Sequence, residues 1–150
     1  MSSQAAYLEA QTRLTRWTDE LEFLAYILCE LIDPERFNAI GFQCHQAADL
    51  PALLKIIRPH TKRPSGNLTA IMSEDELHDF RQLMKKANQI RNKSTHHVTQ
   101  SVDKLEDLED VKRRFSDMLE FSIKSIASDR GIYQVCSNIQ TSLDNMLIAC

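Results

Sequence analysis

Residues 5–32, AAYLEAQTRLTRWTDELEFLAYILCELI, decide the fold class of this chain, because their apolar residues repeat with a period of seven. Two positions of each heptad, three residues apart, carry apolar side chains over four successive heptads. These residues are Tyr7, Leu14, Leu21 and Leu28 at the first position and Ala10, Trp17, Leu24 and Leu31 at the second. Such a stripe is typical of one long amphipathic helix. Asp33-Pro34 ends this helix, because the residue before a proline avoids helical backbone geometry.

The rest of the chain has helical patterning as well. Asp49 and Pro51 form a helix start, and Ser73-Glu74-Asp75-Glu76 is a capping box. Gly131 follows the end of a later helix. The helices expected after the first one span residues 35–39, 49–57, 74–92, 101–128 and 132–148. Residues 1–150 are therefore predicted to form a single all-α domain, a four- to five-helix up-and-down bundle with a long N-terminal helix.

Composition and charge narrow the class of protein. The chain has 150 residues, of which 43% are hydrophobic and 26% are charged, as in an ordinary globular domain. No apolar run approaches the roughly 20 residues that cross a bilayer, and the N-terminus lacks the pattern of a signal peptide. The four cysteines are far apart, which indicates a reducing compartment and no zinc site. We therefore expect a cytoplasmic protein with no membrane segment, no metal and no cofactor.

The net charge of −3 hides a positive segment in the middle of the chain. Residues 55–93 contain nine Lys and Arg against four Asp and Glu, which is a local excess of +5. Such an excess is compatible with a solvated helix face and basic loop, and equally with a surface that binds a polyanion. The residues in this segment that could follow an RNA backbone are Lys62, Arg63, Lys85, Lys86 and Lys93.

Arg91-Asn92-Lys93-Ser94-Thr95-His96 is the most informative short motif, because its residue types suit RNA cleavage without a metal ion. A histidine, whose unperturbed pKa is about 6.5, can deprotonate the 2′-hydroxyl or protonate the leaving oxygen. An arginine presents a planar fork of donors to the phosphate. Asn92 could orient the phosphate or the histidine by hydrogen bonding. His97 could replace His96 as the reacting histidine. The expected products are a 2′,3′-cyclic phosphate and a 5′-hydroxyl.

This hexapeptide resembles the signature of the HEPN superfamily, in which an arginine precedes a histidine by four to six residues and a polar residue follows the arginine. The resemblance implies a helical bundle with the motif between two later helices. It also implies an endoribonuclease of a toxin–antitoxin or defence system, in which the motifs of two protomers meet in a homodimer. Its partners would be RNA and an antitoxin or nucleotidyltransferase. The long apolar stripe of residues 5–32 independently favours a dimer.

Two simpler interpretations stay open. The hexapeptide is also explained as a helix end, because Arg91 complements the helix dipole, Asn92 commonly ends helices, and Ser94 or Thr95 could cap the next helix. The chain could then be an unrelated helical adaptor protein. Alternatively, it could be a HEPN-like domain that binds a nucleotide, RNA or a partner protein without catalysis.

Overall fold

The computed structural model describes residues 3–41, 49–62, 66–96, 102–131 and 141. These residues form helices and turns, and the described part of the chain contains no strand, so the predicted all-α class is confirmed. None of the described helices combines the length and apolar character needed to cross a bilayer. The elements are α1 (Ser3–Ile32), α2 (Pro34–Ile40), α3 (Leu50–Ile57), the 3-10 turns η2 (Arg58–Thr61) and η3 (Asn67–Ala70), α4 (Glu74–His96) and α5 (Val102–Asp129).

The starts of three helices follow the predicted capping residues. Asp33 separates α1 from α2, and its Oδ1 accepts a hydrogen bond from the Arg36 N–H at 3.2 Å. Asp49 caps α3 in the same way. Ser73 and Glu76 form the predicted reciprocal capping box, with bonds of 2.9 and 3.2 Å between each backbone N–H and the other side chain. Each cap supplies an acceptor for N–H groups that have no partner inside the helix.

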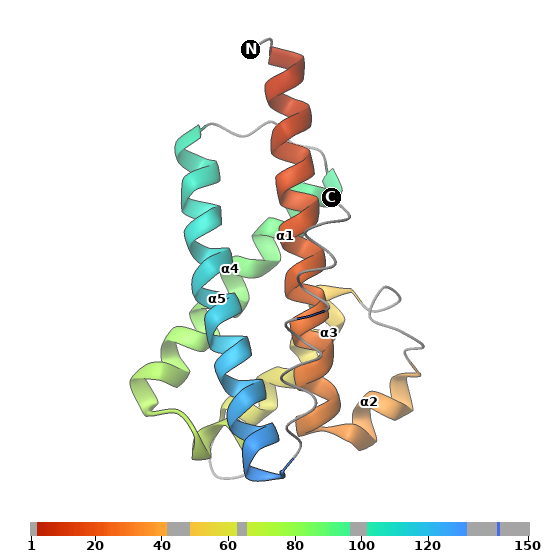
Figure 1. Cartoon of the computed structure of the whole chain (residues 1–150), viewed down its shortest axis with the longest axis vertical. Coiled ribbons are helices and arrows are strands. Elements are labelled where there is room, and N and C mark those ends of the chain that lie inside the picture. Colours follow the sequence, from red (N-terminus) through yellow and green to blue (C-terminus); the bar gives the residue numbers. More distant parts are fainter. Residues whose placement is uncertain (1–2, 42–48, 63–65, 97–101, 132–140, 142–150) are drawn as a thin grey trace.

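α3 runs parallel to α1, and the short α2 separates the two helices in the chain. The carboxylate of Glu22 accepts a hydrogen bond from the first residue of α3, Leu50, and the thiol of Cys29 donates to the carbonyl of Leu53. Contacts therefore advance along both helices in the same direction. The chain leaves the end of α1 through α2, and α3 begins again beside the middle of α1 (Figure 1).

α5 also runs parallel to α1. In Figure 1 both helices begin at the same end of the bundle. Glu20 pairs with Lys112 about midway along both helices, and Arg130 donates to the Leu31 carbonyl where both helices end. α4 runs in the opposite direction and packs on both α1 and α5. α4 thus lies antiparallel to both α1 and α5. This places the C-terminal end of α4 beside the middle of α1.

The core lies along the predicted apolar stripes. Of the eight heptad residues of α1, seven are buried and Tyr7 is partly exposed. The stripe of α4 is buried throughout, and consists of Leu77, Phe80, Leu83, Met84, Ala87 and Ile90. Phe80 of α4 meets Phe115 of α5 edge to face, with ring centroids 5.5 Å apart and both side chains fully buried. α4 is therefore fixed against both long helices by its apolar face.

The segment between α3 and α4 contains η2, η3 and a cluster of polar side chains. His60 Nε2 lies 3.0 Å from Asp33 Oδ2, and Asn67 Nδ2 lies 3.1 Å from His60 Nδ1 while it also donates to the Ile32 carbonyl. The hydrogen bond from His60 lowers the pKa of Asp33. These hydrogen bonds hold η2 and η3 against the junction between α1 and α2. The helix predicted at residues 132–148 falls outside the described residues, except for Thr141.

Candidate functional site

The hexapeptide Arg91–His96 lies entirely within α4, which ends at His96. Arg91 and Asn92 thus lie near the C-terminal end of α4, as predicted, whereas Ser94 and Thr95 do not cap the next helix. Ser94 and Thr95 belong to α4, and the next helix begins at Val102. The segment contains neither glycine nor proline, so nothing in it interrupts the backbone hydrogen bonds of a helix.

Arg91 is the first residue of the motif and lies near the end of α4. It is partly buried, and its positive charge acts on Glu22 of α1. Asn92 is exposed and Lys93 is partly buried, while His97 lies outside the described residues. Positions 91 and 96 of one α-helix differ by about 140° around its axis. The two positions that the motif requires therefore lie on different sides of the same α4.

Glu22 is the functional candidate that the sequence did not reveal. Its Oε2 accepts a hydrogen bond of 2.7 Å from the backbone N–H of Leu50, at the start of α3. Burial raises the pKa of Glu22 from 4.5 to about 7; the Leu50 bond and Arg91 lower it, and the acids Asp19 and Asp49 raise it. A partly buried carboxyl group with a pKa near neutrality is a common feature of functional sites.

No pattern in the sequence marks Glu22. It follows Leu21 in the heptad, at a position that a helix in a bundle normally exposes to solvent. Its burial arises because α3 begins beside it, and this contact depends on the parallel arrangement of α1 and α3. The one local signal is the start of α3 at Asp49-Leu50-Pro51, whose N–H groups require acceptors.

Replacing Glu22 by glutamine is expected to stabilise the protein at about pH 8. The folded state holds the Glu22 proton more tightly than the unfolded state, because its pKa is about 7 rather than 4.5. The wild type therefore loses stability as the pH rises from 4.5 to about 7, and that loss persists at higher pH. The glutamine side chain of Glu22→Gln stays neutral and can still accept the Leu50 N–H bond. Urea unfolding should show a gain of about 1–2 kcal/mol near pH 8, allowing for partial exposure, and no gain near pH 4; equal stability at pH 8 would contradict the assignment.

The predicted RNA-binding residues are spread along α4 rather than gathered around Arg91. Lys85 and Lys86 are exposed on α4, and Lys62 is exposed just after η2. Arg81 of α4 donates to the carbonyl of Thr61, so Lys62 lies near residue 81 of that helix. Ten residues of helix separate this point from Arg91, which corresponds to about 15 Å. The basic residues thus lie at different points along α4 and around its axis, and Arg63 lies outside the described residues.

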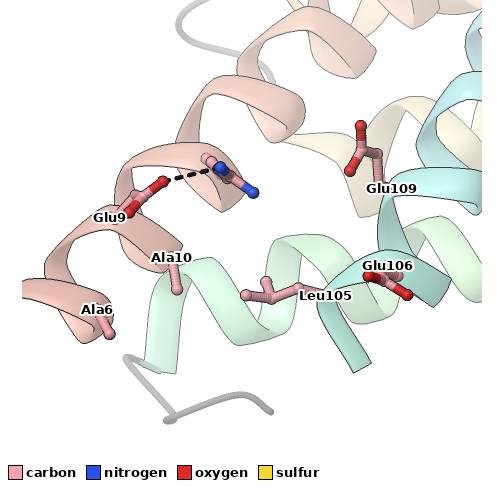
Figure 2. A pocket seen from close by; sticks show the side chains of 7 residues that line it. Ala6, Glu9, Ala10, Leu105, Glu106 and Glu109 are labelled. Atoms are coloured by element: carbon pink, nitrogen blue, oxygen red, sulfur yellow. Dashed lines mark hydrogen bonds and ion pairs between the residues drawn. The ribbon is translucent and has the colours of Figure 1, made fainter. Parts of the chain in front are cut away.

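A separate hollow of about 330 Å³ lies between the first halves of α1 and α5. Figure 2 shows Ala10 and Leu105 lining it together with Glu9, Glu106 and Glu109. Glu9 is paired with Arg13 at 2.8 Å. Its carboxylates make this hollow unsuitable for a polyanion. Among the described residues, no three His, Cys, Asp or Glu side chains converge as metal ligands would.

Comparison of the chain with protein-family models, curated proteins and solved structures finds no match. The HEPN resemblance therefore continues to rest on the hexapeptide and its place in a helical bundle. Arg91, Glu22 and the basic residues of α4 are the features from which a function can be argued.

Proposed function

We propose that this protein is a metal-independent endoribonuclease of the HEPN type that acts as a homodimer in the cytoplasm. The observation that carries the proposal is the position of Arg91. Arg91 is partly buried near the end of α4, a helix that also carries the exposed Lys85 and Lys86. An arginine at this position can present its fork of donors to one phosphate. Lys85 and Lys86 lie about 120–140° from Arg91 around the helix, so they contribute long-range attraction for RNA rather than contacts beside Arg91.

A homodimer explains how Arg91 and the histidine would act on one phosphate. Positions 91 and 96 differ by about 140° around α4, so one helix does not direct both toward the same point. Two protomers related by a twofold axis can bring the arginine of one to the histidine of the other. His96, or the adjacent His97, would then serve as general base or acid, and Arg91 would stabilise the charge on the phosphate oxygens.

The proposed histidine is tested by comparing two neighbouring variants. The purified protein is expected to cleave single-stranded RNA in the presence of EDTA. His96→Ala should reduce the rate about a hundredfold or more, and His97→Ala should reduce it much less, because the proposal assigns the proton transfer to His96. The reverse order would move the assignment to His97. Full activity in both variants, with the helical circular dichroism spectrum retained, would contradict a histidine-based mechanism.

The carboxylates near Arg91 favour one second candidate, a HEPN-like domain that binds RNA or a partner without cleavage. Asp19 and Asp49 act on Glu22 together with Arg91, so negative charge that opposes a phosphate gathers near the guanidinium. In this case the partner would be RNA, an antitoxin or a nucleotidyltransferase. Binding of RNA with no cleavage products in any of the conditions tested would support this candidate over the enzyme.

A further inference from the structure

A chain of hydrogen bonds joins the C-terminal end of α1 to η2 and η3. The side-chain nitrogen of Asn67 donates to the carbonyl of Ile32, the last residue of α1, at 2.7 Å, and lies 3.1 Å from Nδ1 of His60. On the other side of the ring, Nε2 lies 3.0 Å from Oδ2 of Asp33. The second oxygen of this carboxylate accepts the backbone N–H of Arg36 in α2. The imidazole of His60 therefore links three segments that are separate in the sequence.

The roles of donor and acceptor in this chain fix where the protons lie. A carbonyl oxygen only accepts hydrogen bonds, so Asn67 must turn its nitrogen, and not its oxygen, toward Ile32. The same nitrogen presents its second hydrogen to Nδ1 of His60, which must then accept. The ionised carboxylate of Asp33 also accepts, so Nε2 carries the hydrogen. The network therefore holds His60 as a neutral imidazole with its hydrogen on Nε2.

A second proton on His60 is incompatible with this network. The proton would bind to Nδ1 and place an N–H group opposite the NH2 group of Asn67, so that two donors face each other. If the amide turns over and offers its oxygen to the ring, that oxygen faces the carbonyl of Ile32, and two acceptors meet. Asn67 can therefore keep both contacts only while the ring is neutral.

We propose that His60 and Asn67 form a proton-sensitive latch, which ties η3 to the last carbonyl of α1 and opens when Nδ1 of His60 takes up a proton. A hydrogen bond from a charged donor is roughly twice as strong as one between neutral groups. The amide of Asn67 should therefore turn its oxygen to the charged ring and release the Ile32 carbonyl. The latch goes beyond the proposed function and does not depend on it.

The surroundings allow this side-chain motion while they hold the backbone in place. Asn67 is exposed, so its amide has room to turn. The next residue, Leu68, is fully buried, and a side chain at Gly66 would overlap the carbonyl of His60. At the end of α1, the carbonyl of Leu31 keeps its own donor from Arg130. Opening of the latch is therefore a local event, which exposes one helix-end carbonyl to water.

The charged groups around His60 act in both directions on its protonation. The hydrogen bond from His60 lowers the pKa of Asp33, so this carboxylate is ionised near neutral pH and favours the charged ring. Burial raises the pKa of the Cys29 thiol to about 12, so it stays neutral. η3 contributes no titratable group. The other charged groups of the neighbouring elements are Glu30 of α1, Glu35 and Arg36 of α2, Arg58 and Lys62 at the two ends of η2, Arg81 of α4, which binds the Thr61 carbonyl, and Arg130 after α5.

The test is an NMR titration of the purified protein from about pH 8 to pH 5, the range in which histidines ordinarily change charge. At pH 8, nitrogen-15 spectra of His60 should show a hydrogen on Nε2 and none on Nδ1. As the ring gains its second proton, the side-chain amide of Asn67 should shift with the same midpoint. The protection of its hydrogens from exchange, corrected for the intrinsic effect of pH, should fall about fivefold, as expected for the loss of one hydrogen bond.

The backbone amide of Asp33 reports the state of the Ile32 carbonyl, because the two belong to one peptide group. Its resonance should move with the same midpoint in the wild type. Asn67→Asp should hold the latch open at neutral pH, because the introduced carboxylate accepts from Nδ1–H and cannot donate to Ile32. The ring should then keep its second proton to a pH roughly one to three units higher, and the Asp33 amide at pH 8 should resonate where it does in the wild type at pH 5.

Two histidine variants serve as controls. His60→Gln should leave the Asn67 and Asp33 resonances independent of pH in this range. His78→Gln should titrate as the wild type does, because His78 is an exposed histidine of α4.

The wild-type titration decides the inference even if a variant fails to fold. A neutral ring with its hydrogen on Nδ1 would overturn the latch, and so would a ring that does not titrate between pH 8 and pH 5. A ring that gains its second proton while the Asn67 and Asp33 resonances stay unchanged would also overturn it. None of these measurements involves RNA, so failure of the latch and failure of the proposed nuclease are separate results.

Discussion

Replacing Arg91 by alanine is expected to lower kcat/KM for RNA cleavage by a factor of about 100 to 1,000. The guanidinium is the donor proposed to stabilise the charge that develops on the phosphate, and removal of one such donor commonly has an effect of this size. Arg91→Lys should restore only part of the rate, because an ammonium group lacks the planar fork that binds two oxygens at once. The measurement is the initial rate of cleavage of a labelled single-stranded RNA at limiting substrate.

Arg58→Ala is the control for the loss of a positive charge in the same basic segment. Arg58 is exposed at the start of η2. Its replacement should lower the rate by only about threefold, through weaker long-range attraction of RNA, and the effect should disappear at high salt. Equal losses in the two variants would show that Arg91 acts only as part of a positive surface. The circular dichroism spectrum of Arg91→Ala should match that of the wild type, because the side chain is only partly buried.

Phe80→Ala should have the largest effect on stability, about 3–5 kcal/mol. The side chain of Phe80 is fully buried and packs edge to face on Phe115 at a centroid distance of 5.5 Å. Its removal leaves a cavity between α4 and α5 and also deletes the contact between the rings. Because a domain of this size is stabilised by about 5–15 kcal/mol in total, the loss should be evident in urea unfolding.

Phe121→Ala provides the comparison for Phe80. Phe121 lies on α5 with 49% of its surface exposed, so its truncation should change the free energy of unfolding by less than about 1 kcal/mol. Similar losses from both replacements would mean that α4 does not pack against α5 through Phe80.

The positions of the helices could be predicted from the sequence because their apolar residues follow one face. The stripe of α1 and the capping box of α4 indicated boundaries within a few residues of those observed. The end of α4 is later than predicted, because Asn92 does not act as a helix-ending residue here. Its helical propensity is modest, but no glycine or proline follows it within the helix, so the backbone hydrogen bonds continue to His96.

The direction of the helices could not be predicted in the same way. An apolar stripe shows which face of a helix is buried, but it does not show whether the neighbouring helix runs parallel or antiparallel. The order observed depends on α2 and on the return of the chain to Leu50 beside Glu22. The apolar pattern of the sequence contains no sign of this return.

The residues of the candidate site differ in the same way, because only some of them could be recognised from the sequence. Arg91 could be selected from the sequence because its residue type and spacing fit a known chemistry. Glu22 could not, since its raised pKa arises from burial against α3 and from acids that are distant in the sequence, such as Asp49. The assignment of the reacting histidine, the RNA contacts of Lys62 and Lys93, and the dimer all stay predictions.

The most direct test of the account is the chemical nature of the RNA ends formed in EDTA by the wild type and by Arg91→Ala. Mass spectrometry of the wild-type reaction should detect fragments that end in a 2′,3′-cyclic phosphate and fragments that begin with a 5′-hydroxyl. Arg91→Ala, at the same protein concentration, should form these fragments at least about a hundredfold more slowly. No cleavage by the wild type, 3′-hydroxyl ends, or equal cleavage by both proteins would contradict a metal-independent ribonuclease site at Arg91.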